Sequence, residues 1–137
     1  MSVAHKPEVI DRIIAEAQRN DSGVTAVVAT DVAGVIVYWN NRATELYGWD
    51  AAETIGRNVL DVMPTRQTQD EAAQIMESLR AGNPWSGDFI LRRRTGSPVL
   101  MHVTDVPVLM AGVVIGIVGM SRPERRNSPR SIPRVPG

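Results

Sequence analysis

One stretch near the N-terminus, residues 24–56, constrains the fold more than any other part of the chain. Residues 24–30 are rich in alanine and β-branched side chains, which suits a buried strand. A polar turn follows, in which Asp31 accepts backbone hydrogen bonds and Gly34 tolerates positive φ, and it leads into a second strand over 35–39. Two strands joined by so short a turn predict a β-hairpin.

Helix signals follow the hairpin directly. Asn40 or Asn41 is expected to cap a short helix that ends at Gly48. Asp50, with Glu53 three residues later, fits a capping box at the start of a second helical turn. The stretch therefore has the order strand, tight turn, strand, capped helix and second helical turn.

Helical periodicity predicts two longer helices outside this stretch. The first begins at Pro7 and runs for about three turns, and its apolar face contains Val9, Ile10, Ile13, Ile14 and Ala17. The second is expected over 65–79, after a short helical turn that Pro64 stops. Its apolar stripe is formed by Ala72, Ile75, Met76 and Leu79.

The C-terminal half predicts three more strands, over 85–94, 98–108 and 113–120. Short turns link them, which is typical of an antiparallel meander. Together with the hairpin they give an α+β domain with a five-stranded antiparallel sheet. The short helices are expected to close over one face of this sheet and leave a central pocket, and the N-terminal amphipathic helix is additional.

The order of these motifs resembles the PAS domain family, including its PAC motif. The matching residues in the first stretch are Asp31, Gly34, Ile36, Trp39, Asn40, Ala43, Leu46, Gly48, Trp49, Glu53, Ile55, Gly56 and Arg57. Residues 63–64, 84–87, 93–98 and 114–121 resemble later parts of the family pattern, so the resemblance covers roughly 24–122. It implies a PAS-like fold in which the last strand pairs with the first, and a sensory or interaction role.

The length of 137 residues suits one domain with flanking segments. We divide the chain into an N-terminal helix (1–23) that caps the domain or dimerises, a PAS domain (24–122) and a disordered basic tail (123–137) rich in Pro, Ser and Arg. The formal net charge is zero, so no direct binding to nucleic acid is expected. Without an apolar run of ~20 residues or a signal-peptide pattern, we expect a cytoplasmic protein that does not bind membranes.

No group of residues has the pattern of a catalytic site. The carboxylates are scattered through turns and helix faces, and neither His5 nor His102 lies beside a recognisable motif. The chain has no cysteine, which removes thiolate chemistry and thiolate metal sites. We therefore expect no enzyme activity, no catalytic residues and no bound metal.

The resemblance makes the ligand the central question. Haem-binding relatives carry a histidine on the long helix, and the segment 65–79 has none, so haem is not expected. Photosensing flavin relatives, the LOV group, carry Gly-Arg-Asn-Cys on a short helix. Here residues 56–58 match that motif but Val59 replaces the thiol, which excludes a flavin–cysteine adduct.

Flavin held without photochemistry, as FAD in a redox sensor, stays open as an alternative. Trp39 and residues 84–87 also occur in redox-sensing flavin relatives. The positions that correspond to the ring-binding amides of the LOV group are Leu91 and Met101, and both are apolar. An apolar pocket suits a small lipid-like or aromatic molecule, and a packed core without a ligand is the other alternative.

The candidate pocket residues are apolar side chains expected to point inward, together with Thr30 and Asn58, which have polar groups that would orient a ligand. They are Val28, Thr30, Ile36, Leu46, Ile55, Asn58, Val59, Ile75, Met76, Leu79, Leu91, Met101, Val103 and Val118.

We expect a signal-transduction module that senses a small ligand or mediates protein association as a homodimer, and that regulates an effector such as a transcription factor. Candidate interface residues lie on the N-terminal helix and on the outer sheet face: Val9, Ile10, Ile13, Ile14, Ala17, Leu100, His102, Ile115 and Ile117. Two alternatives remain open. The N-terminal helix covers its own sheet, or the chain is a fragment of a larger histidine kinase, phosphatase or cyclase.

Overall fold

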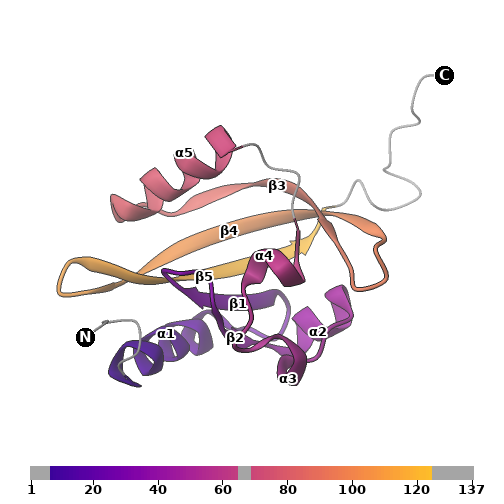
Figure 1. The fold of residues 1–137 in the computed structure, drawn as a ribbon, viewed down its shortest axis with the longest axis horizontal. Helices are drawn as coiled ribbons and strands as arrows, with labels where there is room; N and C mark the ends of the chain where they lie inside the picture. Colours follow the sequence, from indigo (N-terminus) through magenta and orange to yellow (C-terminus); the bar gives the residue numbers. More distant parts are fainter. Residues whose placement is uncertain (1–6, 65–68, 125–137) are drawn as a thin grey trace.

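A computed structural model describes residues 7–64 and 69–124, which form a five-stranded antiparallel sheet with helices on both faces (Figure 1). The strands are β1 (Ala26–Asp31), β2 (Ile36–Trp39), β3 (Trp85–Arg92), β4 (Pro98–Met110) and β5 (Val113–Pro123). They lie in the order β2-β1-β5-β4-β3, and every neighbouring pair is antiparallel. The expected pairing of the last strand with the first is confirmed, with Ala26 opposite Ser121.

The helices are α1 (Pro7–Asn20), α2 (Asn41–Tyr47), α3 (Ala51–Thr54), α4 (Val59–Val62) and α5 (Gln69–Arg80). Helices α2 to α5 lie along one face of the sheet, which we call the inner face, and α1 packs on the opposite, outer face. Figure 1 shows α5 alongside β3, and α1 at the other edge of the sheet near β1 and β2. The predicted α+β architecture is confirmed.

Local signals account for the boundaries of α2 and the start of α3. Asn40 has an extended backbone, and its side-chain oxygen accepts a hydrogen bond from the Ala43 N–H at 2.9 Å. Gly48 ends α2 in the left-handed region with φ of 82°, as glycine tolerates. The capping box at α3 is also present, because the Asp50 N–H donates to Glu53 Oε1 at 3.0 Å.

The inner face carries one hydrophobic core. Residues from four strands and from α2 and α4 meet there, and each such side chain contributes roughly 1.5–3 kcal/mol by leaving water. The buried members are Ala26, Val28, Ile36, Trp39, Ala43, Tyr47, Val62, Leu91, Val99 and Met101.

A second core lies between α1 and the outer face. Its members from α1 are Val9, Ile13 and Ala17, which pack on Val27, Ala29, Val108, Ile115 and Val118. The expectation that these three helix residues face a partner is corrected by this packing, because an apolar outer sheet face must be covered and the chain's own helix covers it. Ile10 and Ile14 stay half-buried on the flank of α1.

A bulge in β5 changes which side chains face inward. The pairing of β4 with β5 shifts register between Val108 and Leu109, which leaves Ile115 as an extra residue on β5. Ile115 and Val118 therefore both lie in the outer core, while Ile117 lies on the inner face. The assignments of Val118 to the pocket and of Ile117 to an outer interface are wrong, because they assumed unbroken alternation.

The element ends differ modestly from the sequence-based expectations. Helix α5 begins at Gln69, and the expected start of this helix at 65 lies outside the described residues, as do residues 1–6 and most of the predicted tail. Strand β5 continues through Pro123, and the Glu124 N–H then donates to the Leu100 carbonyl at 2.9 Å. Of the helices in the described part of the chain, none combines the length and the apolar character needed to cross a bilayer.

Candidate functional site

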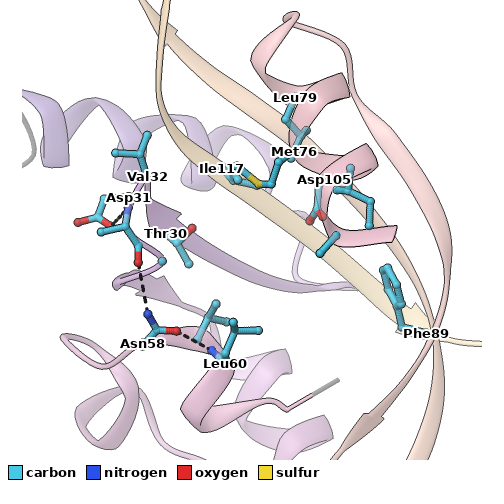
Figure 2. Close-up of a pocket in the computed structure, with 15 residues that line it drawn as sticks. Thr30, Asp31, Val32, Asn58, Leu60, Met76, Leu79, Phe89, Asp105 and Ile117 are labelled. Atoms are coloured by element: carbon cyan, nitrogen blue, oxygen red, sulfur yellow. Dashed lines mark hydrogen bonds between the residues drawn. The ribbon is translucent and has the colours of Figure 1, made fainter. Parts of the chain in front are cut away.

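A cavity of about 430 Å³ lies between the inner face of the sheet and helices α4 and α5 (Figure 2). Its walls come from the end of β1 and the turn after it, from α4, α5 and β3, and from the middle of β4 and β5. Val32 and Leu60 line it while remaining 54% and 61% exposed, so they mark its mouth. The predicted central pocket is therefore present in the fold.

A second cavity of about 200 Å³ extends towards α2. It is lined by Val28, Tyr47, Leu91, Val103 and Ser121, among others. The two cavities share the wall residues Thr30, Val59, Asp105 and Ile117. Because they adjoin along these residues, we treat them as one site and call it the inner pocket.

Helix α5 supplies the apolar roof of the inner pocket. Its lining residues follow one helical stripe, as the sequence predicted: Ala72, Ile75, Met76 and Leu79. In Figure 2, Met76 and Leu79 face the sheet residues Ile117 and Asp105. The thioether of Met76 adapts its shape easily, which suits a wall that closes on a ligand.

Asp105 is a charged group that the sequence analysis did not predict in the pocket. It lies in the shared wall of both cavities, and burial raises the pKa of its carboxyl to about 6. A signal for it existed, because the inward alternation of Val99, Met101 and Val103 on β4 continues to Asp105. The interior therefore contains an ionisable group, which the sequence analysis did not predict.

A buried polar pair closes the end of the smaller cavity. The Tyr47 hydroxyl and the Ser121 hydroxyl lie 2.6 Å apart and share a hydrogen bond that joins α2 to β5. Tyr47 is fully buried, and burial raises its pKa to about 12. The pair therefore stays protonated at neutral pH, and neither residue was foreseen as part of the site.

The polar residues near the mouth already have backbone partners. Asp31 Oδ1 accepts hydrogen bonds from the N–H groups of Ala33 at 2.9 Å and Val35 at 3.0 Å. Asn58 Oδ1 accepts from the Leu60 N–H at 2.9 Å, and Asn58 Nδ2 donates to the Ala33 carbonyl at 3.3 Å. Asn58 thus caps α4, and a ligand would have to compete with these contacts.

Most of the predicted pocket residues line a cavity: Val28, Thr30, Asn58, Val59, Ile75, Met76, Leu79, Leu91 and Val103. Their contact with a ligand stays a prediction. Ile36 and Met101 are fully buried in the inner core, and Leu46 packs against that core. Ile55 is 49% exposed, so its inward assignment is wrong; in the single turn of α3, Thr54 takes the buried position instead.

The outer face brings together a set of side chains of the types that bind metals. Ligand-type atoms of Asp88, His102 and Glu124 lie within 4.8 Å of one another. Asp88 and His102 are opposite each other on β3 and β4, and His102 Nδ1 lies 2.8 Å from Asp88 Oδ1. One imidazole and two carboxylates are a donor set that suits zinc or manganese, which sequence spacing did not reveal.

Leu100 and His102, both predicted on the outer face, are half-buried there, since Met101 between them points into the inner core. Ile90 lies opposite Leu100 on β3 and is 42% exposed. The outer face beyond α1 therefore carries a small apolar area.

Comparison with known proteins matches this chain to a family model and to part of a larger protein. A family model described as the PAS fold matches residues 21–123. A probable serine/threonine-protein kinase of Dictyostelium discoideum is 31% identical over 91 residues, which is 66% of this chain and 6% of the kinase. This chain therefore spans only a small part of that relative's length.

Two solved structures show the same fold. The PAS domain of a protein from Colwellia psychrerythraea superposes with a TM-score of 0.68 at 20% identity, covering 81% of this chain and 97% of that domain. The Rhodobacter sphaeroides LOV protein superposes with a TM-score of 0.69 at 16% identity, covering 93% of this chain and 74% of that protein.

Proposed function

This chain belongs to the PAS family of sensory and signalling domains, and from that premise we propose that it senses a small, mainly apolar molecule in the inner pocket and transmits its presence to an effector. The observation that carries the proposal is the cavity of about 430 Å³ beneath α5. A volume of this order holds a small organic ligand, since ligand sites generally measure about 300–1,000 Å³.

The composition of the walls supports a ligand more than an unfilled packing defect. Apolar side chains from α5, β3 and β5 dominate the larger cavity, and a few polar groups, namely Thr30, Asp105 and the Tyr47–Ser121 pair, converge on the smaller one. Ligand sites commonly combine an apolar lining with a few placed polar groups.

Native mass spectrometry of gently purified protein tests the proposal. We expect a bound mass in the wild-type protein and its loss in Ile117→Phe, because Ile117 borders both cavities and the larger ring fills them. Val113→Phe is the matched control, since Val113 is on the same strand but 63% exposed. Wild-type protein that carries no bound mass, even after incubation with a cellular lipid extract, would contradict the proposal.

Flavin bound without photochemistry is the alternative ligand. The likeness to a LOV protein concerns the fold, and Leu91 lines the smaller cavity with an apolar side chain where the LOV group has an amide. Purified protein without absorbance in the blue would reject this alternative.

For the output, we propose association with a second copy and control of a signalling effector, such as a kinase, phosphatase, cyclase or transcription factor. The kinase relative, of which this chain matches a small part, supports a role beside a catalytic domain. The open reading frame that contains this sequence tests the proposed link to an effector directly, because an adjoining effector domain would be encoded in it.

The apolar area on the outer face supports association of two copies. Ile90 is 42% exposed beside Leu100, and Ile10 and Ile14 of α1 are half-buried. We expect Ile90→Glu to lower the sedimentation coefficient of a dimer to that of a monomer. Val24→Glu, at a loop position that is 74% exposed, should leave it unchanged. A wild-type protein that sediments as a monomer at high concentration would contradict the association.

A further inference from the structure

We propose that Asp105 makes the inner pocket selective for an apolar molecule that carries a nitrogen hydrogen-bond donor, with a protonated amine as the best fit. The inference rests on the proposed function, since it names the chemical class that the same pocket would take. It also predicts that anionic ligands of the same size and shape bind poorly.

The position of Asp105 makes it a contact for anything that fills the pocket. Its carboxyl belongs to the walls of both cavities, as do Thr30, Val59 and Ile117. Figure 2 shows it on the sheet side of the hollow, between Met76 of α5 and Phe89 of β3. A ligand body packed against these two side chains would bring its polar end to the carboxyl.

The carboxyl is also available. Within residues 7–64 and 69–124 no group donates a hydrogen bond to Asp105, and no dashed line reaches it in Figure 2. Three other polar groups nearby are engaged: the Tyr47 hydroxyl with Ser121, Asp31 with its own turn, and Asn58 with α4. Asp105 is thus a charged contact that a ligand can use without displacing a protein partner.

The charges around the pocket favour a cation. No Lys, Arg or His is among the described residues that line either cavity, while Asp31 and Asp105 both are. Burying an ionised carboxyl without a partner is unfavourable, and burial raises the Asp105 pKa to about 6. An ammonium or N–H donor beside it would form a charge-assisted hydrogen bond and restore the ionised form. A ligand carboxylate would be repelled.

A glycine on the neighbouring strand leaves space for this carboxyl. Gly119 lies opposite Asp105 on β5, and a Cβ atom there would be 2.9 Å from Asp105 Oδ1. Any other residue at this position would occupy the space that the carboxyl uses. The glycine therefore gives the carboxyl room beside the pocket.

Three probes with one ring system test the inference: 2-naphthylmethylamine, 2-naphthylmethanol and 2-naphthoate. Their binding to isotope-labelled protein is followed by NMR titration at pH 7.5. We expect the amine to bind wild-type protein at least about tenfold more tightly than the alcohol, because hydrogen bonds to charged groups are the stronger ones, and naphthoate to bind most weakly.

Asp105→Asn should bring the amine within about twofold of the alcohol, because it keeps the shape of the side chain and removes its charge. Asp11→Asn, a change of the same kind on the exposed face of α1, should preserve the wild-type preference. If wild-type protein binds amine and alcohol equally, or if the preference survives Asp105→Asn, the role of Asp105 is overturned while the pocket stands. If none of the three probes shifts resonances of the pocket residues, the proposed ligand site fails and the role of Asp105 with it.

Discussion

Gly119 on β5 lies directly opposite Asp105 on β4, and a Cβ atom at Gly119 would be 2.9 Å from the Asp105 Oδ1 atom. The nearest backbone atom, the Val28 carbonyl oxygen, would be at 3.4 Å, which is ordinary contact. The space at Gly119 is therefore limited mainly by one carboxyl group. This relationship allows the position of the carboxyl to be tested without a ligand.

Gly119→Ala should lower the free energy of unfolding by about 1–3 kcal/mol, because the added methyl group overpacks the site beside Asp105. In an Asp105→Ala background the same change should cost clearly less, since the atom in the way is gone. Urea denaturation of the four proteins measures both values. Additive losses would show that the methyl group is opposed by something other than the carboxyl.

Asp105 should make the protein less stable as pH rises. Its pKa is raised from 3.8 to about 6, so the folded chain holds the proton more tightly than the unfolded chain does. Its contribution to stability is therefore full below about pH 4, and it falls as pH rises towards 6 and stays low above that. The shift corresponds to roughly 2–3 kcal/mol.

Thermal or urea unfolding between pH 4 and pH 8 measures this effect. Asp105→Asn should be more stable than wild-type protein at pH 7.5, and the difference should shrink towards pH 4. Asp11→Asn provides the control, because that side chain is exposed on α1. A constant difference between wild type and Asp105→Asn across this range would show that the carboxyl titrates normally.

The Tyr47–Ser121 hydrogen bond should contribute measurably to stability. Tyr47→Phe removes the 2.6 Å partner of the hydroxyl of Ser121, a residue that is 7% exposed, and the expected loss is about 1–2 kcal/mol. Adding Ser121→Ala should recover part of this loss, because both polar groups are then gone. If the double variant is less stable than the single one, the hydroxyl of Ser121 has another role.

Ile13→Ala should reveal whether α1 packs on its own sheet. Ile13 is fully buried over Gly116, so its truncation should cost about 2–5 kcal/mol, whereas Ile14→Ala at a half-buried position should cost less. The loss should not depend on protein concentration, since the contact lies within one chain. A loss that disappears at high concentration would place α1 against a second copy instead.

The features that the sequence predicted well are those that depend on neighbours along the chain. Asn40 caps α2 and Gly48 ends it because capping needs only a side-chain oxygen or a tolerated φ within a few residues. The stripe ending at Leu79 likewise follows from the helical repeat and the need to bury an apolar face. The order of the strands followed from the family resemblance and is confirmed.

The errors arose where distant residues decide the outcome. The bulge at Ile115 depends on how β4 and β5 pair, and it moved Val118 to the outer core and Ile117 to the pocket. Asp105 was missed because a carboxyl was not expected inside, although the alternation on β4 points to it. The Tyr47–Ser121 pair joins residues 74 positions apart, and no local sequence pattern predicts such a contact.

Consecutive residues of β5 face opposite sides of the sheet. Ile117 borders the inner pocket, while at Gly116 an added Cβ would be 2.7 Å from the Ile13 side chain of α1. Pocket and N-terminal helix are thus separated by a single thickness of main chain. An occupant that displaced the main chain at Ile117 would therefore also move the surface on which α1 packs.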